Sequence, residues 1–485
     1  MSTTALPNII IMYADDLGFG DIGCYGATRI PTPHLDDLAA TGLLFEQGYS
    51  TAATCTPSRY SLLTGSYPWR NPKAAILPGD AAMIIDESTP TLATMLRNAG
   101  YATGVVGKWH LGLGHGSLDW NRSIPRTPND VGFDYSCIMA ATNDRVPCVY
   151  IENREVVGGD WHDPIEVTYD DSRAFKDIPT GRSHPDQLTM RFSHGHDGTI
   201  VNGVSRIGHM RGGKKALWQD ETMADYFAAK AADFVRQNCG RPFFLYYAFH
   251  QPHVPRIPGP RFRGRTGLGP RGDVIAEMDD CAGRLINLLD QLGIRENTMV
   301  IFSSDNGPVL DDGYCDQAVE LNGKHQAAGP LRGGKYSLFD GGTHVPLIIN
   351  QPGTIRAGVS SALISHVDFY ASFAALAGQK LAPGAAPDSL DLSDVIMGLT
   401  EHGRDELVLE GIHGKLLLRN HAWVYIPPYK GAARDLHTNI ELGNAASPQL
   451  YNLNADIGQI RNLAEFEPIV LDTMATRLRQ IIAAG

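Results

Sequence analysis

The feature that most constrains the fold is a regular alternation of short apolar segments with amphipathic ones. Strand-like segments are predicted at residues 7–14, 102–107, 242–249, 299–304 and 345–349. Helix-like segments are predicted at residues 34–40, 87–98, 222–237, 274–292 and 367–376. This alternation is typical of an α/β protein, so we predict a large, mostly parallel central sheet that is flanked by helices.

Two departures from the alternation indicate how the chain is organised. Residues 113–215 are rich in Asp, Arg, Gly, Pro and His, and we expect an irregular insertion on the substrate side of the sheet. A linker near residue 381 precedes three short strand-like segments and a helix-like segment at 467–482. We therefore predict a catalytic domain over residues 1–380 and a small α+β subdomain over 381–485, with an antiparallel sheet and one helix.

Composition excludes several classes of protein. The chain of 485 residues has 53 acidic and 41 basic residues, and this balance argues against nucleic-acid binding through a basic face. No apolar run approaches the roughly 18 residues that a membrane span requires. Seven cysteines without a C-x-x-C motif argue against a full disulfide framework and a zinc-cysteine site. A pairing of Cys137 with Cys148 stays open.

The apolar run near the beginning of the chain bears on localisation. Ile9 to Ala14 has no basic segment before it and no small-residue cleavage site after it, so we interpret it as a strand and not a signal peptide. The sequence as written favours a cytoplasmic protein. A periplasmic or secreted protein is the alternative if a leader has been removed.

Two pairs of polar residues directly follow predicted strands. Asp15 and Asp16 come after the first strand, and Asp305 and Asn306 come after the strand at 299–304. Ligand sites in α/β proteins gather at the carboxyl ends of parallel strands, so these side chains converge if the strands are neighbours. Three carboxylates at close range repel one another, and a hard cation with oxygen ligands, Ca²⁺ or Mg²⁺, relieves the repulsion. Alternatively, each pair only caps the turn after its strand.

A cysteine stands at the start of another predicted helix. Pro57 suits the first helical turn and Gly65 suits the position just past the end. Cys55 then lies at the helix N-terminus, where free N–H groups and the dipole favour anions, and Arg59 is one turn away. This position is compatible with a reactive thiol of low pKa or with a buried structural cysteine.

The segment that contains this cysteine resembles the signature of the sulfatase family. Residues 55–65, CTPSRYSLLTG, match the pattern C-x-P-S-R-x-x-L-L-T-G. Other segments resemble the family in the same order along the chain: NIIIMYADDLGFGD at 8–21, GKWHLG at 107–112, HQPHVP at 250–255, DNG at 305–307, RGGK at 332–335, LYNL at 450–453 and NLA at 462–464. The sequence is thus similar to formylglycine-dependent sulfatases of the arylsulfatase and N-acetylgalactosamine-6-sulfatase type, which have an alkaline-phosphatase-like fold.

The resemblance implies a chemistry for Cys55. A maturation enzyme, the formylglycine-generating partner, oxidises this cysteine to an aldehyde, which is hydrated to a geminal diol. One hydroxyl then attacks sulfur, and the second hydroxyl allows sulfate to leave as the aldehyde re-forms, so one difficult step becomes two easier ones. The cation implied is Ca²⁺, ahead of Mg²⁺, held by Asp15, Asp16, Asp305 and Asn306.

The resemblance also implies roles for the remaining site residues. Arg59 steadies the diol, and Lys108 and Lys335 bind the sulfate oxygens. His110 is the candidate base on the second hydroxyl. His253, with Lys335, is the candidate proton donor to the leaving oxygen, and His250 is the alternative.

Polar clusters in the insertion are candidates for contacts to the organic part of the substrate. They are Asn143, Asp144 and Arg145, together with His194 and His196. Polar side chains there can set specificity, although ordinary loop hydrogen bonds are the more common explanation of such clusters. A separate acidic pair, Asp279-Asp280, is expected on the solvated face of the helix at 274–292.

We therefore predict a sulfatase that hydrolyses sulfate monoesters to an alcohol and inorganic sulfate, acting on a small sulfated substrate, with sugars favoured by the polar insertion. A phosphonate monoester or phosphodiester hydrolase of the same superfamily is the alternative. An unmatured module that binds calcium and anions is the non-enzyme alternative.

Overall fold

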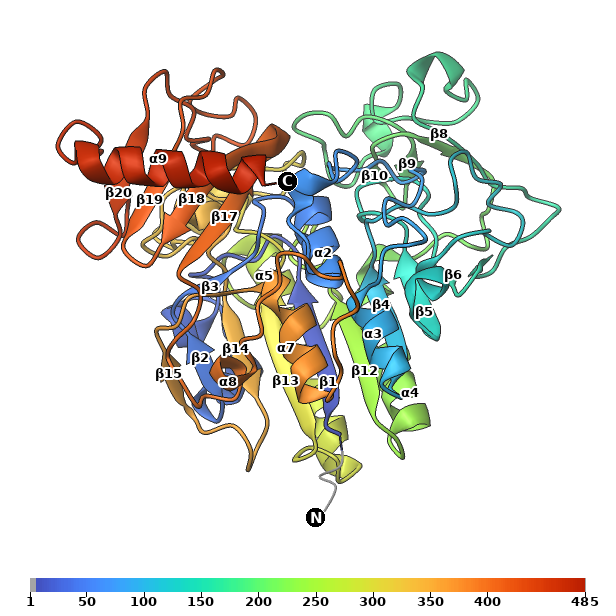
Figure 1. Ribbon diagram of the computed structural model, residues 1–485. Coiled ribbons are helices and arrows are strands. Elements are labelled where there is room, and N and C mark those ends of the chain that lie inside the picture. Colours follow the sequence, from blue (N-terminus) through green and yellow to red (C-terminus); the bar gives the residue numbers. More distant parts are fainter. Residues whose placement is uncertain (1–5, 485) are drawn as a thin grey trace.

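The computed structural model describes residues 6–484, in which two main sheets of unequal size are accompanied by short two-stranded ribbons (Figure 1). Within these residues the larger sheet has ten strands in the order β15-β2-β14-β13-β1-β12-β4-β5-β6-β7. Their bounds along the chain are β1 Asn8–Ala14, β2 Leu43–Phe45, β4 Ala102–Lys108, β5 Tyr135–Met139, β6 Ile151–Glu152, β7 Glu155–Val156, β12 Phe243–Ala248, β13 Thr298–Ser304, β14 Leu347–Asn350 and β15 Gly358–Ser360. Strands β13, β1, β12, β4 and β5 run parallel to one another, which confirms the predicted α/β architecture.

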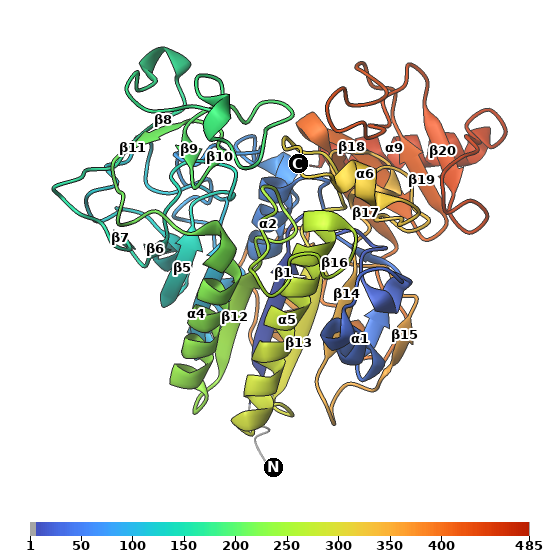
Figure 2. The ribbon, with the colours of Figure 1, turned by 180° about the vertical axis from the view of Figure 1, so that it is seen from behind.

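Helices cover both faces of this sheet. Figure 2 shows α1 (Pro33–Ala40), α4 (Met223–Asn238) and α5 (Gly269–Gln291) on one face. Figure 1 shows α2 (Cys55–Thr64), α3 (Leu92–Asn98) and α7 (Phe369–Leu376) on the other. Because both faces are covered, every residue of the central strands β1, β12 and β13 is buried, and the middle of each strand is an unbroken apolar run instead of an alternating one. Short helices α6 (Ala318–Asn322) and α8 (Ser393–Ile396) lie in connections.

The smaller sheet is antiparallel, as predicted. It consists of β17 (Glu406–Gly411), β18 (Lys415–Asn420), β19 (Trp423–Ile426) and β20 (Gln449–Asn452), and α9 (Pro468–Ala483) contacts β18 and β19. The prediction missed β20. The C-terminal sheet is joined to the segment before α2, because the Ala53 N–H donates to the Glu410 carbonyl oxygen (2.8 Å) and the Glu410 N–H donates to the Thr51 carbonyl oxygen (3.0 Å).

The insertion is more regular than expected at one point. Strand β5 belongs to it and pairs in parallel with β4 in the main sheet, although its sequence YSCIM has a weak strand signal. Strands β6 and β7 of the insertion extend the same sheet beyond β5 in antiparallel pairing. The rest forms loops with two-stranded ribbons: β8 (Glu166–Thr168) with β11 (His209–Arg211), and β9 (Ile200–Val201) with β10 (Val204–Ser205). Another short pair joins β3 (Gly48–Tyr49) to β16 (Ile364–Ser365). In Figure 1 the insertion and the C-terminal sheet flank the end toward which β1 points.

Some local expectations were wrong. Asp279 does not face solvent: it is buried and accepts hydrogen bonds from the backbone N–H groups of His34 (3.2 Å) and Leu35 (2.8 Å). It therefore caps α1, whose own N-cap residue Thr32 makes no side-chain capping bond. Helix α3 begins only at Leu92, because the Thr91 side chain accepts from the Thr94 N–H and caps the helix there.

Two further findings concern cysteines and membranes. All seven cysteines lie within the described residues and are free, so Cys137 and Cys148 are not paired. No helix between residues 6 and 484 is both long enough and apolar enough to cross a bilayer.

Candidate active site

The two strands that end in polar pairs lie side by side. Strands β1 and β13 are parallel with Ala14 opposite Ser304, so the pairs that follow them meet at the same edge of the sheet. The Asp16 N–H donates to Asp305 Oδ1 (3.2 Å), and Asn306 Nδ2 donates to Asp16 Oδ1 (2.8 Å). We call Asp15, Asp16, Asp305 and Asn306 the strand-end cluster. All four are fully or almost fully buried.

Helix α2 places Cys55 against this cluster. The extended backbone of Thr54 (φ −148°) leads into the helix, and Gly65 ends it in the left-handed conformation (φ 63°). Cys55 Sγ lies 3.6 Å from Asp15 Oδ1 and 3.9 Å from Asp16 Oδ1. Every residue of α2 is buried, which fixes the sulfur relative to the strand ends.

Arg59 and Lys108 compensate two of the carboxylates. Arg59 donates to Asp305 Oδ2 from Nε (2.9 Å) and from Nη2 (2.7 Å), and these are charge-assisted hydrogen bonds. Lys108, the last residue of β4, donates to Asp15 Oδ1 (2.6 Å). Both cations are completely buried, so removing either partner leaves an uncompensated charge inside the protein.

Lys335 compensates the remaining carboxylate, Asp16, and contacts Asp312, which Tyr336 also contacts. The sequence analysis missed Asp312 and Tyr336. Lys335 donates to Asp16 Oδ2 (2.8 Å) and to Asp312 Oδ2 (2.7 Å), and Tyr336 donates to Asp312 Oδ1 (2.9 Å). Asp312 lies in a loop without regular structure, seven residues after Asp305. Only the sequence Asp311-Asp312-Gly313 marks it, which is an ordinary turn pattern.

The electrostatic environment shifts the pKa values of the Asp15 and Asp305 carboxyl groups in opposite directions. Burial and the neighbouring carboxylates raise the pKa of Asp15 well above its usual value, against the opposing effect of Lys108. Burial also opposes ionisation of Asp305, but Arg59 and Lys108 outweigh it and lower the pKa of that carboxyl. Burial, with Asp305 and Asp15 nearby, raises the pKa of the Cys55 thiol, so its position at a helix N-terminus does not produce a low-pKa thiol.

The strand-end cluster fits a metal ion. One ligand atom from each of Asp15, Asp16, Cys55 and Asp305 lies within 4.8 Å of the others. Asp15 Oδ2 and Asn306 Oδ1 are buried without a hydrogen-bond partner. Buried polar atoms are normally satisfied, so these two oxygens are available as ligands, and oxygen donors favour a hard divalent cation.

Cys55 opens into a cavity of about 90 Å³, which we call the Cys55 pocket. It is lined by Cys55, Ile76, His110, Asp144, Arg145, His196, Ile207, His253, Asp312, Lys335 and Tyr336. Its charged and imidazole groups come from the loops that follow strands of the main sheet and from the insertion, which are far apart in the sequence.

The structure distinguishes the two candidate histidines near residue 250. His253 lines the Cys55 pocket, with Nε2 3.8 Å from Asp16 Oδ2 and Nδ1 hydrogen-bonded with the Val254 carbonyl oxygen (2.7 Å). Its loop is held beside the strand-end cluster because the Asp15 N–H donates to the Gln251 carbonyl oxygen (2.9 Å). His250 is buried outside this pocket, next to Phe227.

His110 also lines the pocket, in a constrained conformation. Its backbone is left-handed (φ 57°), its Nε2 is hydrogen-bonded with the Leu77 carbonyl oxygen (3.0 Å), and its Nδ1 is buried without a partner. Burial and the nearby Lys108 lower the pKa of His110 well below its usual value. Burial and Lys335 do the same to the pKa of His253.

Three of the five candidate residues in the insertion reach the pocket. Asp144 accepts from Arg145 Nη1 (2.9 Å) and is hydrogen-bonded with His196 Nε2 (2.9 Å). Asn143 is buried elsewhere and donates to the Pro255 carbonyl oxygen, and the ring of His194 stacks on that of His437. Asn143 and His194 therefore do not line the Cys55 pocket.

Comparison with known proteins agrees with this arrangement. The family model named Sulfatase matches residues 7–379. The chain is 47% identical to N-acetylgalactosamine-6-O-sulfatase of Bacteroides thetaiotaomicron, covering 98% of this chain and 93% of that protein. It is 32% identical to human arylsulfatase A, covering 94% and 83%. A solved sulfatase structure from work on glycosaminoglycan metabolism by B. thetaiotaomicron superposes with a TM-score of 0.97, at 46% identity and 99% coverage of both chains.

A fold of this kind, with a cysteine held against a cluster of carboxylates and cations, defines a class of ester hydrolase. The chain belongs to the sulfatase family, and its activity is that of a sulfuric ester hydrolase. Members of this family use formylglycine and a metal ion.

Proposed function

We propose that the protein removes the 6-O-sulfate from N-acetylgalactosamine units of glycosaminoglycan fragments, with the Cys55 pocket as the reaction site. The full-length similarity to a sulfatase named for this substrate carries the proposal. Further support comes from the chemistry of the pocket, in which Lys335 and Arg145 provide positive charge for a sulfate group.

The residues of the chain support distinct parts of such a reaction. Lys108 and Lys335 can bind sulfate oxygens, where negative charge is concentrated in the transition state. Arg59 holds Asp305 in place through two hydrogen bonds. His253 lines the same pocket as Cys55, and a bound sulfate anion favours its imidazolium form, which can give the proton on Nε2 to the leaving oxygen. His110 can take a proton through its unpartnered Nδ1 atom as sulfate is released.

We propose that Cys55 is oxidised to formylglycine by a maturation enzyme. Once hydrated, this group supplies the hydroxyl that attacks sulfur. Cys55 is buried against Asp15 and Asp16, so we expect modification before the chain has folded completely. Mass spectrometry of the peptide that contains residue 55 tests this, since conversion of the thiol to the aldehyde lowers the mass, and an intact thiol in an active sample contradicts it.

We propose Ca²⁺ as the ion of the strand-end cluster, held by Asp15, Asp16, Asp305 and Asn306. When bound, the ion supplies positive charge that acidifies and orients the nucleophile. Carboxylate and amide oxygens with two unpartnered atoms support the assignment. Elemental analysis after dialysis, together with the melting temperature with added Ca²⁺ or Mg²⁺, tests the identity of the ion.

We also propose that residues 1–380, with the insertion at 113–215, form the catalytic domain and that residues 381–485 form a subdomain. The family match ends at residue 379, and β17 to β20 form a separate sheet, which supports this division.

The decisive experiment for the function is a panel of substrates. Matured protein is assayed with N-acetylgalactosamine carrying sulfate at O6 or at O4, with an aryl sulfate, and with a phosphonate monoester and a phosphodiester. We expect the 6-O-sulfate to give the highest kcat/KM. Preference for the 4-O-sulfate overturns the substrate assignment, and preference for a phosphorus ester favours the alternative hydrolase.

A further inference from the structure

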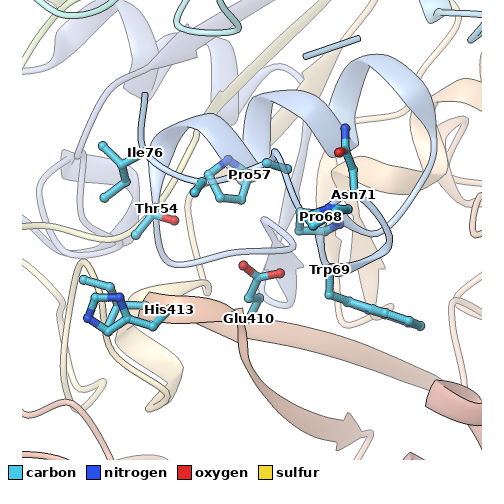
Figure 3. A pocket seen from close by; sticks show the side chains of 13 residues that line it. Thr54, Pro57, Pro68, Trp69, Asn71, Ile76, Glu410 and His413 are labelled. Atoms are coloured by element: carbon cyan, nitrogen blue, oxygen red, sulfur yellow. The ribbon is translucent and has the colours of Figure 1, made fainter. Parts of the chain in front are cut away.

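A second, larger pocket adjoins the Cys55 pocket. It has a volume of about 480 Å³, within the range of ligand sites, and we call it the Glu410 pocket. It is lined by residues of the segments 68–76 and 410–414, together with Thr54 and Pro57 (Figure 3). Segment 410–414 comes from the C-terminal sheet, whereas Thr54 and Pro57 belong to the start of α2.

The two pockets share a wall. Ile76 lines both of them, and Thr54 precedes Cys55 directly. Tyr336 lines the Cys55 pocket, and its carbonyl oxygen accepts from the N–H of Ile412, which lines the Glu410 pocket (3.0 Å). A substrate whose sulfate occupies the Cys55 pocket can therefore extend across Ile76 into the larger space.

The Glu410 pocket contains a buried carboxyl group that the protein does not satisfy. Glu410 is only 5% exposed, its Oε2 is buried without a hydrogen-bond partner, and its carboxyl makes no hydrogen bond to any residue between 6 and 484. Figure 3 shows this side chain extending from β17 toward the start of α2, with Trp69 and His413 on either side. The indole Nε1 of Trp69 is a second buried polar atom without a partner.

Burial raises the pKa of Glu410 to about 8, so the group is protonated at neutral pH. A protonated carboxyl both donates and accepts hydrogen bonds, as a sugar hydroxyl does. Among the described residues, no lysine or arginine lines this pocket, whereas Arg145 and Lys335 line the other one. Apart from His413, the lining of the Glu410 pocket thus has no side chain that can carry the positive charge that a sulfate group requires.

The rest of the lining combines apolar and polar surface. Pro57, Trp69 and Ile76 provide apolar surface, and Thr54 and Asn71 provide hydrogen-bonding groups. A sugar ring has the same two properties, because its C–H faces are apolar and its hydroxyl groups are polar. We infer that the Glu410 pocket is a subsite for a second, unsulfated sugar unit of the substrate, which Glu410 contacts through a hydroxyl group. This inference rests on the proposed function and extends it from a single sugar to an oligosaccharide.

Steady-state kinetics on matured, full-length protein test the subsite. The substrates are 6-sulfated N-acetylgalactosamine, a disaccharide that joins this unit to an unsulfated sugar, and the same disaccharide with a second sulfate on the added sugar. For the wild type we expect the singly sulfated disaccharide to have a kcat/KM about tenfold above that of the monosaccharide. The doubly sulfated disaccharide loses this advantage.

Variants then test whether the Glu410 pocket causes the higher kcat/KM of the disaccharide. Ala75→Trp fills the pocket from an exposed position in its lining, and Trp69→Ala removes a wall. Both variants should abolish the preference for the disaccharide while keeping kcat/KM for the monosaccharide within about twofold of the wild type. Lys73→Trp is the matched control, because it puts the same bulky side chain in the same segment but outside the lining, and it should retain the preference.

The outcomes separate the two proposals. Cleavage of the monosaccharide and the disaccharide with equal kcat/KM overturns the subsite and leaves the proposed function intact. A preference that survives Ala75→Trp also overturns it, even if Trp69→Ala fails to fold. Failure to cleave either substrate overturns the proposed function itself.

Discussion

The Cys55 pocket and the Glu410 pocket share Ile76 but are built in opposite ways. In the first, the buried carboxylates of the lining are each paired with a cation, Asp144 with Arg145 and Asp312 with Lys335. In the second, a carboxyl group is buried without any partner and no lysine or arginine lines the space. The comparison indicates that paired charges hold reacting groups in place, whereas an unpaired neutral group is free to bind part of a substrate.

Replacing Cys55 gives the largest effect expected in either pocket. Cys55→Ala removes the sulfur atom that we propose as the source of the nucleophile, so we expect kcat to fall by at least about 10³-fold, as when other enzymes lose their nucleophile. The melting temperature should change little, because the side chain is small and the ion pairs around it remain. Enzyme assays and thermal unfolding measure the two effects.

Cys281→Ala is the control for this change. Cys281 is also buried and free, but it lies on α5 away from the pocket, so the variant should keep normal activity. If Cys55→Ala were as active as Cys281→Ala, residue 55 would not be the source of the nucleophile.

Asp305→Ala tests the buried ion pair between Asp305 and Arg59. The change leaves Arg59 buried without its close partner, which costs about 3–5 kcal/mol of unfolding free energy when a buried ion pair is broken. The metal content should fall as well. Chemical denaturation and elemental analysis check both expectations, and a stable variant with full metal content would contradict the ligand assignment.

Two residues of the insertion test whether contact with the pocket determines function. Arg145→Met removes a positive charge from the Cys55 pocket, so we expect kcat/KM to fall by about 10- to 100-fold, the usual effect of losing a charged hydrogen-bond partner. His194→Ala lies outside the pocket and should change kcat/KM by less than about twofold. Equal effects of the two variants on kcat/KM would mean that the lining of the pocket does not define the binding site.

The pH dependence of the unfolding free energy tests whether Glu410 in the Glu410 pocket is buried as a neutral acid. The pKa of Glu410 is raised to about 8 in the folded protein from an ordinary value of 4.5, so the folded chain keeps a proton that the unfolded chain releases between these values. Glu410 thus destabilises the fold progressively as pH rises from 4.5 to 8, by roughly 1 kcal/mol per pH unit, and the effect levels off above pH 8. Glu410→Gln should remove this slope in denaturation curves measured at pH 5.5, 6.5 and 7.5. An unchanged slope would show that the carboxyl is not buried as a neutral acid.

The sequence predicted the strand-end cluster well because local signals coincide there. Asp15 and Asp305 directly follow apolar strands, and the parallel pairing of β1 with β13 brings them together. Cys55 was placed at a helix start by Pro57 and Gly65, and α2 begins and ends as expected. Signals of this kind depend on neighbours in the chain, so they can be recognised without knowledge of tertiary contacts.

The parts that sequence reasoning missed depend on contacts between distant segments. Asp312 lies in an irregular loop and acquires its role only through Lys335. Glu410 stands in the apolar strand sequence ELVLEG, where nothing marks its burial beside Thr54. Asp279 resembled a surface acid because the N-terminus of α1, which it caps, is more than 240 residues away in the chain.

The backbone hydrogen bonds between Glu410 and residues 51–53 have a consequence for engineering and for evolution. They anchor the segment before α2 to the C-terminal sheet. We therefore expect that a chimaera that exchanges this sheet with that of a relative displaces Cys55 unless the matching loop is transferred with it. Truncation before β17 should likewise inactivate the protein, although every side chain proposed for catalysis would still be present. The C-terminal sheet and the segment before α2 are therefore expected to evolve together, with compensating substitutions where they contact each other.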